Sequence, residues 1–263
     1  MKYDVIVIGG GIVGLGTAYQ LLQQNSKLRI AILEKETKIA LHQTGNNSGV
    51  IHSGVYYKPG SEKAINCKRG YQMMLDFCDK EGIDYDLCGK VIVAVTEKEI
   101  PILEGIYERG VENGLKGLTY LNETELKEKE PHVNGIKAIW VPQAGIVDYK
   151  VVASKYAEII EEKGGELKLD HKVIDIDIQS DQVTVKTNQG NFESKLLVNC
   201  AGLYSDKIAQ ITGQGKDFKI VPFRGEYYDL KPEKRDLVKG LIYPVPNPEF
   251  PFLGVHFTRM IGG

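Results

Sequence analysis

The sequence lacks the long apolar run of a membrane-spanning protein and the basic block of many nucleic-acid-binding proteins. No stretch approaches the roughly 20 consecutive apolar residues that a helix needs to span a bilayer. Lysine and arginine total 33 against 35 aspartate and glutamate, a net charge of −2, and no block of basic residues occurs. This composition gives no electrostatic footprint for nucleic acid. We therefore expect no nucleic-acid partner, and any membrane contact should be peripheral.

Cysteine is scarce, and none of the four cysteines has close metal-type spacing. Without a secretory signal, widely spaced cysteines favour the reduced state of a cytoplasmic chain. We predict no metal site and a cytoplasmic location, with any membrane contact at the inner face of the cell membrane. The content of 42% hydrophobic and 26% charged residues is typical of a globular chain, long enough for one large domain or two joined ones.

Against these absences, glycine is arranged in a specific pattern near the start of the chain. The apolar run Val5 to Ile8 is followed by Gly9, Gly11 and Gly14, which satisfy G-x-G-x-x-G before a helical pattern over about 12–24. In such a turn the first glycine permits the sharp bend, the second lets a pyrophosphate approach the backbone, and the third lets the helix pack on the strand. The pattern predicts a strand, a tight turn and a helix.

A second apolar strand over 30–33 ends at Glu34, about 20 residues beyond the last glycine, where an acid binds a ribose hydroxyl. Strand, helix, second strand and acid agree on an adenine dinucleotide site. The alternative is a glycine turn that only closes a strand–helix corner. The motif alone does not separate FAD from NAD.

A long polar, glycine-rich loop follows, from His42 to Ser61, without strand or helix periodicity. Loops of this length usually carry function. Thr44, Asn47 and Ser48 suit pyrophosphate or flavin contacts, and the alternative for all three is ordinary turn chemistry.

Helical spacing and capping signals predict five further helices. They cover residues 62–81 with Gly82 as the C-cap, 96–113 opened by a Thr96/Glu99 capping box, a short helix from Asn122 to Pro131, about 152–163, and 205–211.

Alternation and short apolar runs predict the strands. These are residues 85–87, 91–95, 138–141, an antiparallel insertion over 174–178 and 183–185, a buried strand over 196–200, then 220–230, 241–245 and 253–258. Ala201 and Gly202 allow close backbone approach, so the stretch Ala201 to Asp206 is a candidate second cofactor contact.

Several motifs outside the glycine turn are more specific. They are HQTGNNSGVIHSGVYYKPGS (42–61), GIVDY (145–149), NCAGLYSD (199–206), PFRGEYY (222–228), LIYPVPNP (241–248) and PFLGVHFTRM (251–260). Together they resemble the L-2-hydroxyglutarate oxidases and dehydrogenases, within the broader D-amino acid oxidase-like FAD family. The resemblance implies FAD rather than NAD, and oxidation of L-2-hydroxyglutarate to 2-oxoglutarate by hydride transfer from C2 to flavin N5, with electrons passed to quinone or oxygen.

The resemblance also implies an α/β fold in which a Rossmann-like FAD-binding domain is joined to a mostly antiparallel α+β substrate domain. We expect the FAD-binding domain over 1–90 and 145–215 and the substrate domain over 91–144 and 216–263. Family members continue after the TRM segment with a glycine-rich strand and helix that complete the flavin site. The 263 residues do not include them.

Oxidation of a 2-hydroxy acid needs a base for the hydroxyl proton, and imidazole titrates in the right range. His52 and His256 are the two candidates. His52 lies in the long loop, where it either faces flavin or substrate or only stabilises the loop. His256 alternates with apolar residues, so it lies either at a pocket wall or in the core as a satisfied histidine.

A dicarboxylate is best held by guanidinium groups, and the arginines within the motifs are Arg224 and Arg259. Arg224 is expected on a strand of the substrate domain, where the alternative is an ion pair with Glu226. Tyr243 offers a hydroxyl to the same pocket, or packs in the core.

The predicted catalytic set is therefore His52, His256, Arg224, Arg259 and Tyr243. The predicted cofactor contacts are Gly9, Gly11, Gly14, Glu34, Thr44, Asn47, Ser48, Val173, Ala201 and Gly202. Two other functions stay open: a related flavin oxidase of an amino acid or glycerol 3-phosphate, and a catalytically incomplete nucleotide-binding fragment.

Overall fold

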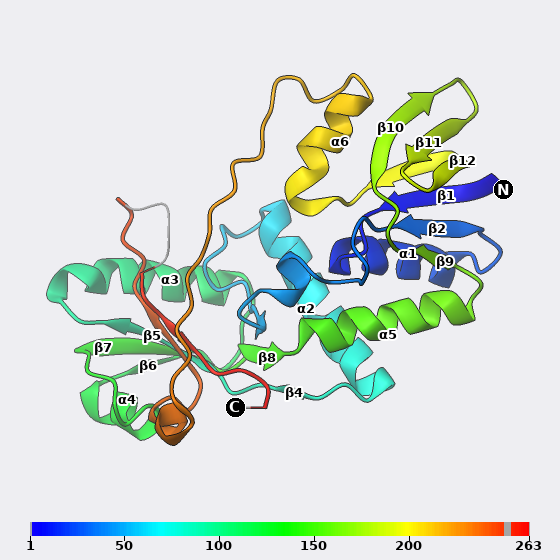
Figure 1. The fold of residues 1–263 in the computed structure, drawn as a ribbon. Helices are drawn as coiled ribbons and strands as arrows, with labels where there is room; N and C mark the ends of the chain where they lie inside the picture. Colours follow the sequence, from blue (N-terminus) through cyan, green and yellow to red (C-terminus); the bar gives the residue numbers. More distant parts are fainter. Residues whose placement is uncertain (1, 250–253, 263) are drawn as a thin grey trace. The chain divides into compact units, whose positions relative to one another are not determined.

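A computed structural model describes residues 2–249 and 254–262 of the chain (Figure 1). The chain packs as two units: unit 1 is Met1–Asn47 with Tyr149–Glu226, and unit 2 is Ser48–Asp148 with Tyr227–Gly263. Residues 48–90 thus pack within unit 2, whereas the sequence placed them in the cofactor domain. The assignment of one domain to cofactor and one to substrate stays a prediction.

Unit 1 is built on a six-stranded sheet in the order β10-β11-β12-β1-β2-β9. The four strands β12, β1, β2 and β9 are parallel, and β10 and β11 extend the sheet as an antiparallel hairpin. Their bounds are β1 Lys2–Ile8, β2 Ile30–Leu33, β9 Glu166–Lys168, β10 Val173–Ile178, β11 Val183–Thr187 and β12 Gly190–Asn199. The predicted α/β class, with its antiparallel insertion, is confirmed.

Three helices pack on this sheet: α1 Ile12–Gln24, α5 Tyr149–Glu162 and α6 Ser205–Ile211. Helix α1 packs against β1, β2 and α5 (Figure 1). Ile208 of α6 packs in a core cluster of unit 1 with Ile6 and Ile8 of β1 and with residues of the hairpin β10–β11. Because alternate side chains of a strand point to opposite faces, the sheet is buried on both sides at its centre. The 3-10 helices Gln43–Gly45 and Gly202–Tyr204 complete the unit.

Unit 2 contains two sheets. The larger has the order β14-β13-β5-β7-β6 and the smaller β3-β8-β4. Among the described strands of unit 2, only β13 and β5 pair in parallel, so the unit is mostly antiparallel, as predicted. The bounds are β3 Val50–Ile51, β4 Tyr85–Asp86, β5 Lys90–Ala94, β6 Thr119–Leu121, β7 Lys137–Val141, β8 Gly145–Val147, β13 Leu241–Pro244 and β14 Phe257–Thr258.

The helices of unit 2 begin and end at the predicted signals. They are α2 Glu62–Glu81, α3 Ile100–Glu112 and α4 Glu123–Lys129, with 3-10 turns at Glu97–Glu99 and Pro232–Leu237. Gly82 ends α2 in the left-handed conformation, and the capping boxes at Thr96/Glu99 and Asn122/Glu125 are both formed. Local capping chemistry thus fixes these boundaries.

The strand predicted over 220–230 is wrong. This segment is irregular, and the side chains of Phe223 and Tyr228 are 70% and 92% exposed. Its apolar alternation resembles a strand, but among the described residues no strand is formed over this range.

Two other strand predictions need correction. The strand over 196–200 is not fully buried: Leu197 packs on the core cluster, while Leu196 on the opposite face is 63% exposed. Of the strand predicted over 253–258, only Phe257–Thr258 is formed, and Leu253 lies outside the described residues.

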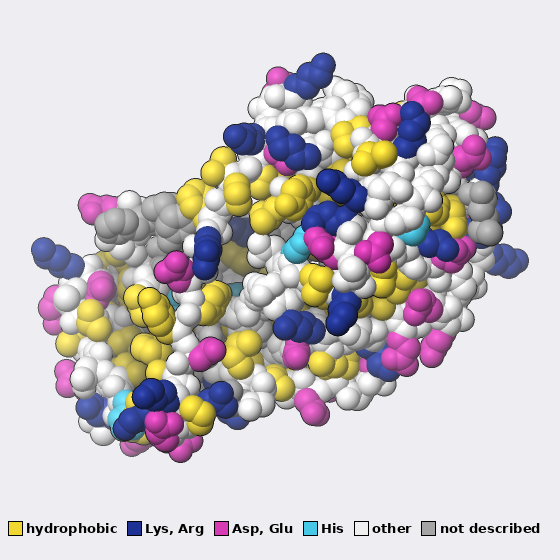
Figure 2. Space-filling model, in the orientation of Figure 1, with side chains coloured by type: hydrophobic (Ala, Val, Ile, Leu, Met, Phe, Trp, Pro, Cys, Tyr) yellow, Lys and Arg dark blue, Asp and Glu magenta, His cyan; other side chains and the backbone are white. Residues whose placement is uncertain are grey.

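Charged side chains of both signs are interspersed on the face shown in Figure 2, without separation by sign. Among the residues that the structure describes, no helix combines the length and apolar character needed for a membrane span.

Candidate functional site

The glycine turn in unit 1 has the geometry that its three glycines predict. Gly9 has a φ of +111°, and a Cβ there would lie 2.4 Å from the Cys200 carbonyl oxygen. A Cβ on Gly14 would lie 2.0 Å from the Gly9 carbonyl oxygen. The first glycine therefore admits the end of β12 and the third admits helix α1, as expected for a dinucleotide-binding turn.

Gly11 differs from its neighbours because space lies beside it. A Cβ there would meet only the Thr44 hydroxyl, at 3.3 Å, among the described atoms. Gly11 is the N-cap of α1, it has no side chain to cap the helix, and the first turn contains no acidic residue. The free amides and the positive end of the helix dipole fit a phosphate group.

The loop after β2 is attached to the same helix end through Thr44. Its hydroxyl oxygen accepts a hydrogen bond from the Ile12 amide at 2.9 Å, although the two residues are far apart in sequence. The hydroxyl proton remains available for an acceptor such as a phosphate oxygen. Asn47 instead donates to the carbonyls of Gln43 and Thr44 within the turn.

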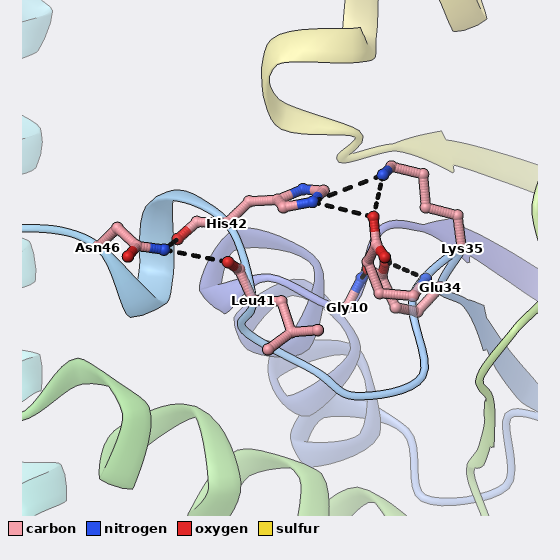
Figure 3. Close-up of polar contacts among 7 residues, drawn as sticks. Gly10, Glu34, Lys35, Leu41, His42 and Asn46 are labelled. Carbon is pink, nitrogen blue, oxygen red and sulfur yellow. Dashed lines mark hydrogen bonds and ion pairs between the residues drawn. The ribbon is translucent and has the colours of Figure 1, made fainter. Parts of the chain in front are cut away.

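Glu34 lies at the end of β2, buried, with both carboxylate oxygens engaged (Figure 3). One oxygen accepts from the Gly10 amide at 2.7 Å and the other from the Glu36 amide at 2.9 Å. Each carboxylate oxygen has a second lone pair, so these bonds leave room for a ribose hydroxyl. The ribose role stays a prediction.

A polar group surrounds this corner on its exposed side. The His42 ring points toward Lys35 (Figure 3). Its Nε2 also lies 3.0 Å from Oε1 of Glu36. Lys35 also pairs with Glu36, and its ammonium lies 5.0 Å from the centre of the Tyr204 ring. His42 thus positions the loop, and its contacts are to protein groups.

The remaining predicted cofactor contacts are distributed around the sheet. Ala201 lies beside the glycine turn, since its Cα would be 3.4 Å from a Cβ on Gly9. Gly202 follows it with a φ of +56° and open space around it. Val173 begins β10 and packs against the core cluster, and Ser48 is half-buried in unit 2. None of these roles is tested by the fold alone.

Unit 2 contains a second cluster, centred on a residue that sequence reasoning missed. Lys90 begins β5 and is 1% exposed. Its ammonium nitrogen lies 4.7 Å from the ring centres of both Tyr56 and Tyr243. Within residues 2–249 and 254–262, no hydrogen bond or ion pair reaches it. Burial lowers the pKa of Lys90 from 10.5 to about 7, against an opposing effect of Cys67.

Two predicted catalytic histidines are electrostatically or sterically linked to this cluster. His52 follows β3 and is an exposed residue, and partial desolvation of its imidazole lowers its pKa from 6.5 to about 4. Electrostatic interactions with Lys90 and, to a smaller extent, with His256 lower the pKa of His52 further. His52 is therefore neutral at pH 7 and able to accept a proton.

His256 stacks against Tyr243 with ring centres 4.6 Å apart. Its Nδ1 is 3.0 Å from the Gly254 carbonyl oxygen. Because a carbonyl oxygen only accepts, Nδ1 carries the proton and Nε2 is the acceptor. The sequence alternatives of core histidine and pocket-wall histidine are both compatible with its half-buried position.

The two predicted arginines have different surroundings. Arg259 donates to the Asp86 carboxylate at 3.0 Å, and both side chains are partly exposed. Arg224 lies in the irregular segment of unit 1, exposed, and no ion pair joins it to Glu226 or another described residue. The alternative of a Glu226 pair is not observed, and the expected strand position of Arg224 is wrong.

The parallel sheet, glycine turn and strand-terminal acid define an adenine-dinucleotide-binding α/β protein. A sequence model described as "FAD dependent oxidoreductase" matches residues 4–263. The chain belongs to this family of FAD-dependent oxidoreductases, which answers the FAD-or-NAD question that the glycine motif left open.

Individual relatives agree with this assignment. The chain is 55% identical to an L-2-hydroxyglutarate dehydrogenase of Indibacter alkaliphilus, over 100% of this chain and 66% of that one. It is 46% identical to the human mitochondrial L-2-hydroxyglutarate dehydrogenase, over 100% of this chain and 59% of that one. The chain thus spans 59% to 66% of the length of these curated relatives.

Among solved structures, a dithionite-reduced L-alpha-glycerophosphate oxidase of Mycoplasma pneumoniae with FAD bound superposes with a TM-score of 0.85. It is 26% identical, and the match covers 100% of this chain and 70% of that one. The predicted family resemblance and fold class are confirmed.

Proposed function

We propose that this chain contributes to the FAD-dependent oxidation of L-2-hydroxyglutarate to 2-oxoglutarate. The single observation that carries the substrate is the identity to L-2-hydroxyglutarate dehydrogenases along the whole chain. The reaction removes a hydride from C2 and a proton from the C2 hydroxyl. When bound, FAD supplies the hydride acceptor, and we propose quinone or oxygen as the final acceptor.

The residues of unit 1 fit a dinucleotide with its diphosphate at Gly9 to Gly14. The open space at Gly11, the absence of acid in the first turn of α1 and the Thr44 hydroxyl all support this position. Glu34 would accept from the adenosine ribose, and the Ala201–Gly202 backbone would form a second contact. An acid at the end of β2 favours a ribose without a 2′-phosphate.

In unit 2, His52 is the better candidate for the base. Its ring is neutral at pH 7 and keeps contact with solvent, so a substrate hydroxyl could reach it. His256 would then orient the substrate or His52, with Nε2 as its free acceptor. A dicarboxylate bound beside His52 would favour the protonated form of that imidazole and raise its pKa towards the working range.

The first test is spectroscopic. Purified protein should be yellow, or become yellow with added FAD, and anaerobic L-2-hydroxyglutarate should bleach the flavin band. Protein that stays colourless with added FAD would support the alternative of an incomplete nucleotide-binding fragment.

A substrate panel separates the enzymatic alternatives. Dye reduction with L-2-hydroxyglutarate but not with glycine or glycerol 3-phosphate is the expected result. Glycerol 3-phosphate deserves inclusion because an L-alpha-glycerophosphate oxidase superposes on the full chain. Reduction by glycerol 3-phosphate alone would replace the proposed substrate.

A pair of variants tests the base. His52→Gln should lower kcat by about 100-fold or more, since a general base contributes 10²–10⁴-fold, while FAD content stays unchanged. His256→Gln is the matched control and should raise KM more than it lowers kcat. The reverse pattern would assign the base to His256.

A further inference from the structure

The cluster around Lys90 contains a buried positive group without a negative partner. A buried ammonium group is strongly disfavoured unless it is paired. The faces of Tyr56 and Tyr243 offset part of this cost through cation–π attraction, but neither ring supplies an acceptor oxygen for Nζ in the described structure. A bound anion would supply the negative partner that the charged form of Lys90 lacks among the described residues.

Two buried hydroxyl groups in unit 2 also lack hydrogen-bond partners among the atoms that the structure describes, and one of them belongs to this cluster. The Tyr56 hydroxyl and the Ser53 hydroxyl are both buried, and neither has a hydrogen-bond partner in the part of the chain that the structure describes. Burial raises the pKa of Tyr56, so its hydroxyl remains a donor. Buried polar groups without partners are rare in folded proteins, and Tyr56 also lies against Lys90.

Other lysines of unit 2 show how unusual this arrangement is. Lys137 lies over the Tyr120 ring at 4.5 Å, and its Nζ also pairs with Glu104 at 2.7 Å. Lys129 lies over Trp140 near the exposed end of α4. Only Lys90, of these three, combines aromatic contact with near-complete burial and no acid.

We propose that Lys90 binds a carboxylate group of the substrate, with the Tyr56 hydroxyl as a second donor. The ligand class is a small carboxylate anion, and the site rests on the proposed function for the identity of that anion as L-2-hydroxyglutarate. Lys90 takes the role that sequence reasoning gave to Arg224. A single ammonium suits this role because it is a compact point charge that changes its protonation readily when buried.

The decisive experiment compares two non-oxidisable probes that differ only in charge. Glutarate and its neutral diamide, glutaramide, are titrated into the flavin-loaded protein by calorimetry and by thermal shift. The wild type should bind glutarate and not glutaramide. Lys90→Met, similar in length but uncharged, should weaken glutarate binding by at least about tenfold, and Tyr56→Phe should weaken it less.

Lys137→Met is the matched control, since it removes a lysine over a tyrosine of the same sheet. It should leave glutarate binding unchanged. Equal glutarate affinity in the wild type and Lys90→Met would overturn the proposal. A purely structural role for Lys90 predicts instead that Lys90→Met loses thermal stability without glutarate, whereas removal of an unpaired buried charge should maintain or raise it.

A measurement on the wild type avoids any folding problem. Glutarate binding at pH 8, followed in two buffers of different ionisation enthalpy, should show proton uptake as Lys90 becomes fully charged. The other titratable groups near Lys90 are Tyr56, Tyr243, Cys67 and His52, and His256 lies on Tyr243. The same titration on His52→Gln and on His256→Gln therefore separates the contribution of each histidine. Absence of uptake in the wild type would contradict the proposal.

The outcomes separate this inference from the proposed function. If wild-type flavin is not reduced by L-2-hydroxyglutarate but glutarate binding still depends on Lys90, the oxidation is wrong and the carboxylate site stands. If the flavin is reduced and Lys90→Met retains the wild-type KM, the oxidation stands and the carboxylate site is wrong.

Discussion

Glu34 in unit 1 and Lys90 in unit 2 are both buried charged residues at the end of a strand, yet their surroundings differ. The Glu34 carboxylate accepts hydrogen bonds from two backbone amides. The Lys90 ammonium contacts two aromatic rings and no acceptor in the described chain. A buried charge that accepts or donates hydrogen bonds within the fold has a structural role. A buried charge without such partners is a candidate for binding a ligand.

Glu130 sharpens this comparison. It is 2% exposed and accepts from the amides of Lys239 and Gly240 at 3.0 and 2.7 Å. This is the same arrangement as at Glu34, but in unit 2, which does not contain the glycine turn. The hydrogen bonds that Glu34 accepts from backbone amides are therefore structural. Only the position of Glu34 beside the glycine turn supports a role in cofactor binding.

The largest expected effect comes from Gly14→Ala. The added Cβ would meet the Gly9 carbonyl oxygen at 2.0 Å, and we expect a loss of about 4 kcal/mol of stability together with FAD binding. Gly16→Ala in the same helix is the control, because its Cβ would meet only Tyr156 at 3.8 Å. It should gain up to about 1 kcal/mol from helix propensity. Thermal unfolding and bound-FAD absorbance measure both, and equal behaviour of the two variants would contradict the packing argument.

Next in size are Glu34→Ala and Glu130→Ala. Each leaves two amides without an acceptor and should cost about 3 kcal/mol of stability. Only Glu34→Ala should also weaken FAD binding beyond what its stability loss explains, as measured by FAD titration below the unfolding temperature. If the two variants weaken FAD binding equally, Glu34 has no cofactor role of its own.

A smaller effect is the pH dependence that Lys90 imposes on the ligand-free protein. Its pKa is about 7 in the folded state against 10.5 ordinarily, so above pH 7 the unfolded state holds more protons. Folding stability should therefore rise with pH, by up to about 1.4 kcal/mol per unit. The comparison belongs between pH 7 and 9, because the thiols of Cys78 and Cys88, with pKa values of about 11, oppose the trend above that range.

Lys90→Met should remove this slope. The difference in unfolding temperature between the variant and the wild type should shrink steadily as the pH rises from 7 to 9. A difference that stays constant would mean that Lys90 keeps its proton throughout.

The smallest effect is expected at the exposed pair of Lys195 and Asp4. A hydrogen bond from Lys195, with a second from the Arg29 backbone, lowers the pKa of Asp4 from 3.8 to about 2. This contribution is present above pH 4 and is lost as pH falls through 2. Lys195→Met should cost less than about 0.5 kcal/mol at pH 7, and the loss should vanish near pH 2. Lys186→Met, which breaks the exposed ion pair with Asp175, is the control for losing a surface ion pair elsewhere in unit 1.

The sequence predicted unit 1 well because its signals are local. The glycine turn, the strand over 30–33 and the helix over 12–24 each follow from spacing within a few residues, and all three are confirmed. Caps such as Ser61 and Gly82 are equally local. By contrast β3, β4 and β8 are two or three residues long, too short for periodicity, and β3 and β8 were missed.

The candidate site was harder to predict because burial is a property of the whole fold. Lys90 opens a short apolar strand, KVIVA, where a lysine ordinarily marks the solvated end of the strand. Its burial depends on β7 and β13 pairing on either side of β5, which no local pattern reveals. Arg224 is the opposite case. Its apolar neighbours predicted a buried strand, but the structure forms no strand there and Arg224 is exposed.

The pairing of β1 with β12 also constrains how the chain acquires its fold. Val5 pairs with Leu196, and Gly9 needs the backbone of Cys200 beside it, so the amino-terminal strand cannot complete its sheet until the chain as far as Cys200 has left the ribosome. Contacts between distant segments slow folding and leave apolar edges exposed meanwhile. The stretch Ser48–Asp148, which is continuous, has no such delay for its internal contacts. The nascent protein should therefore depend most on a chaperone after β1 has been synthesised and before β12 is available to pair with it.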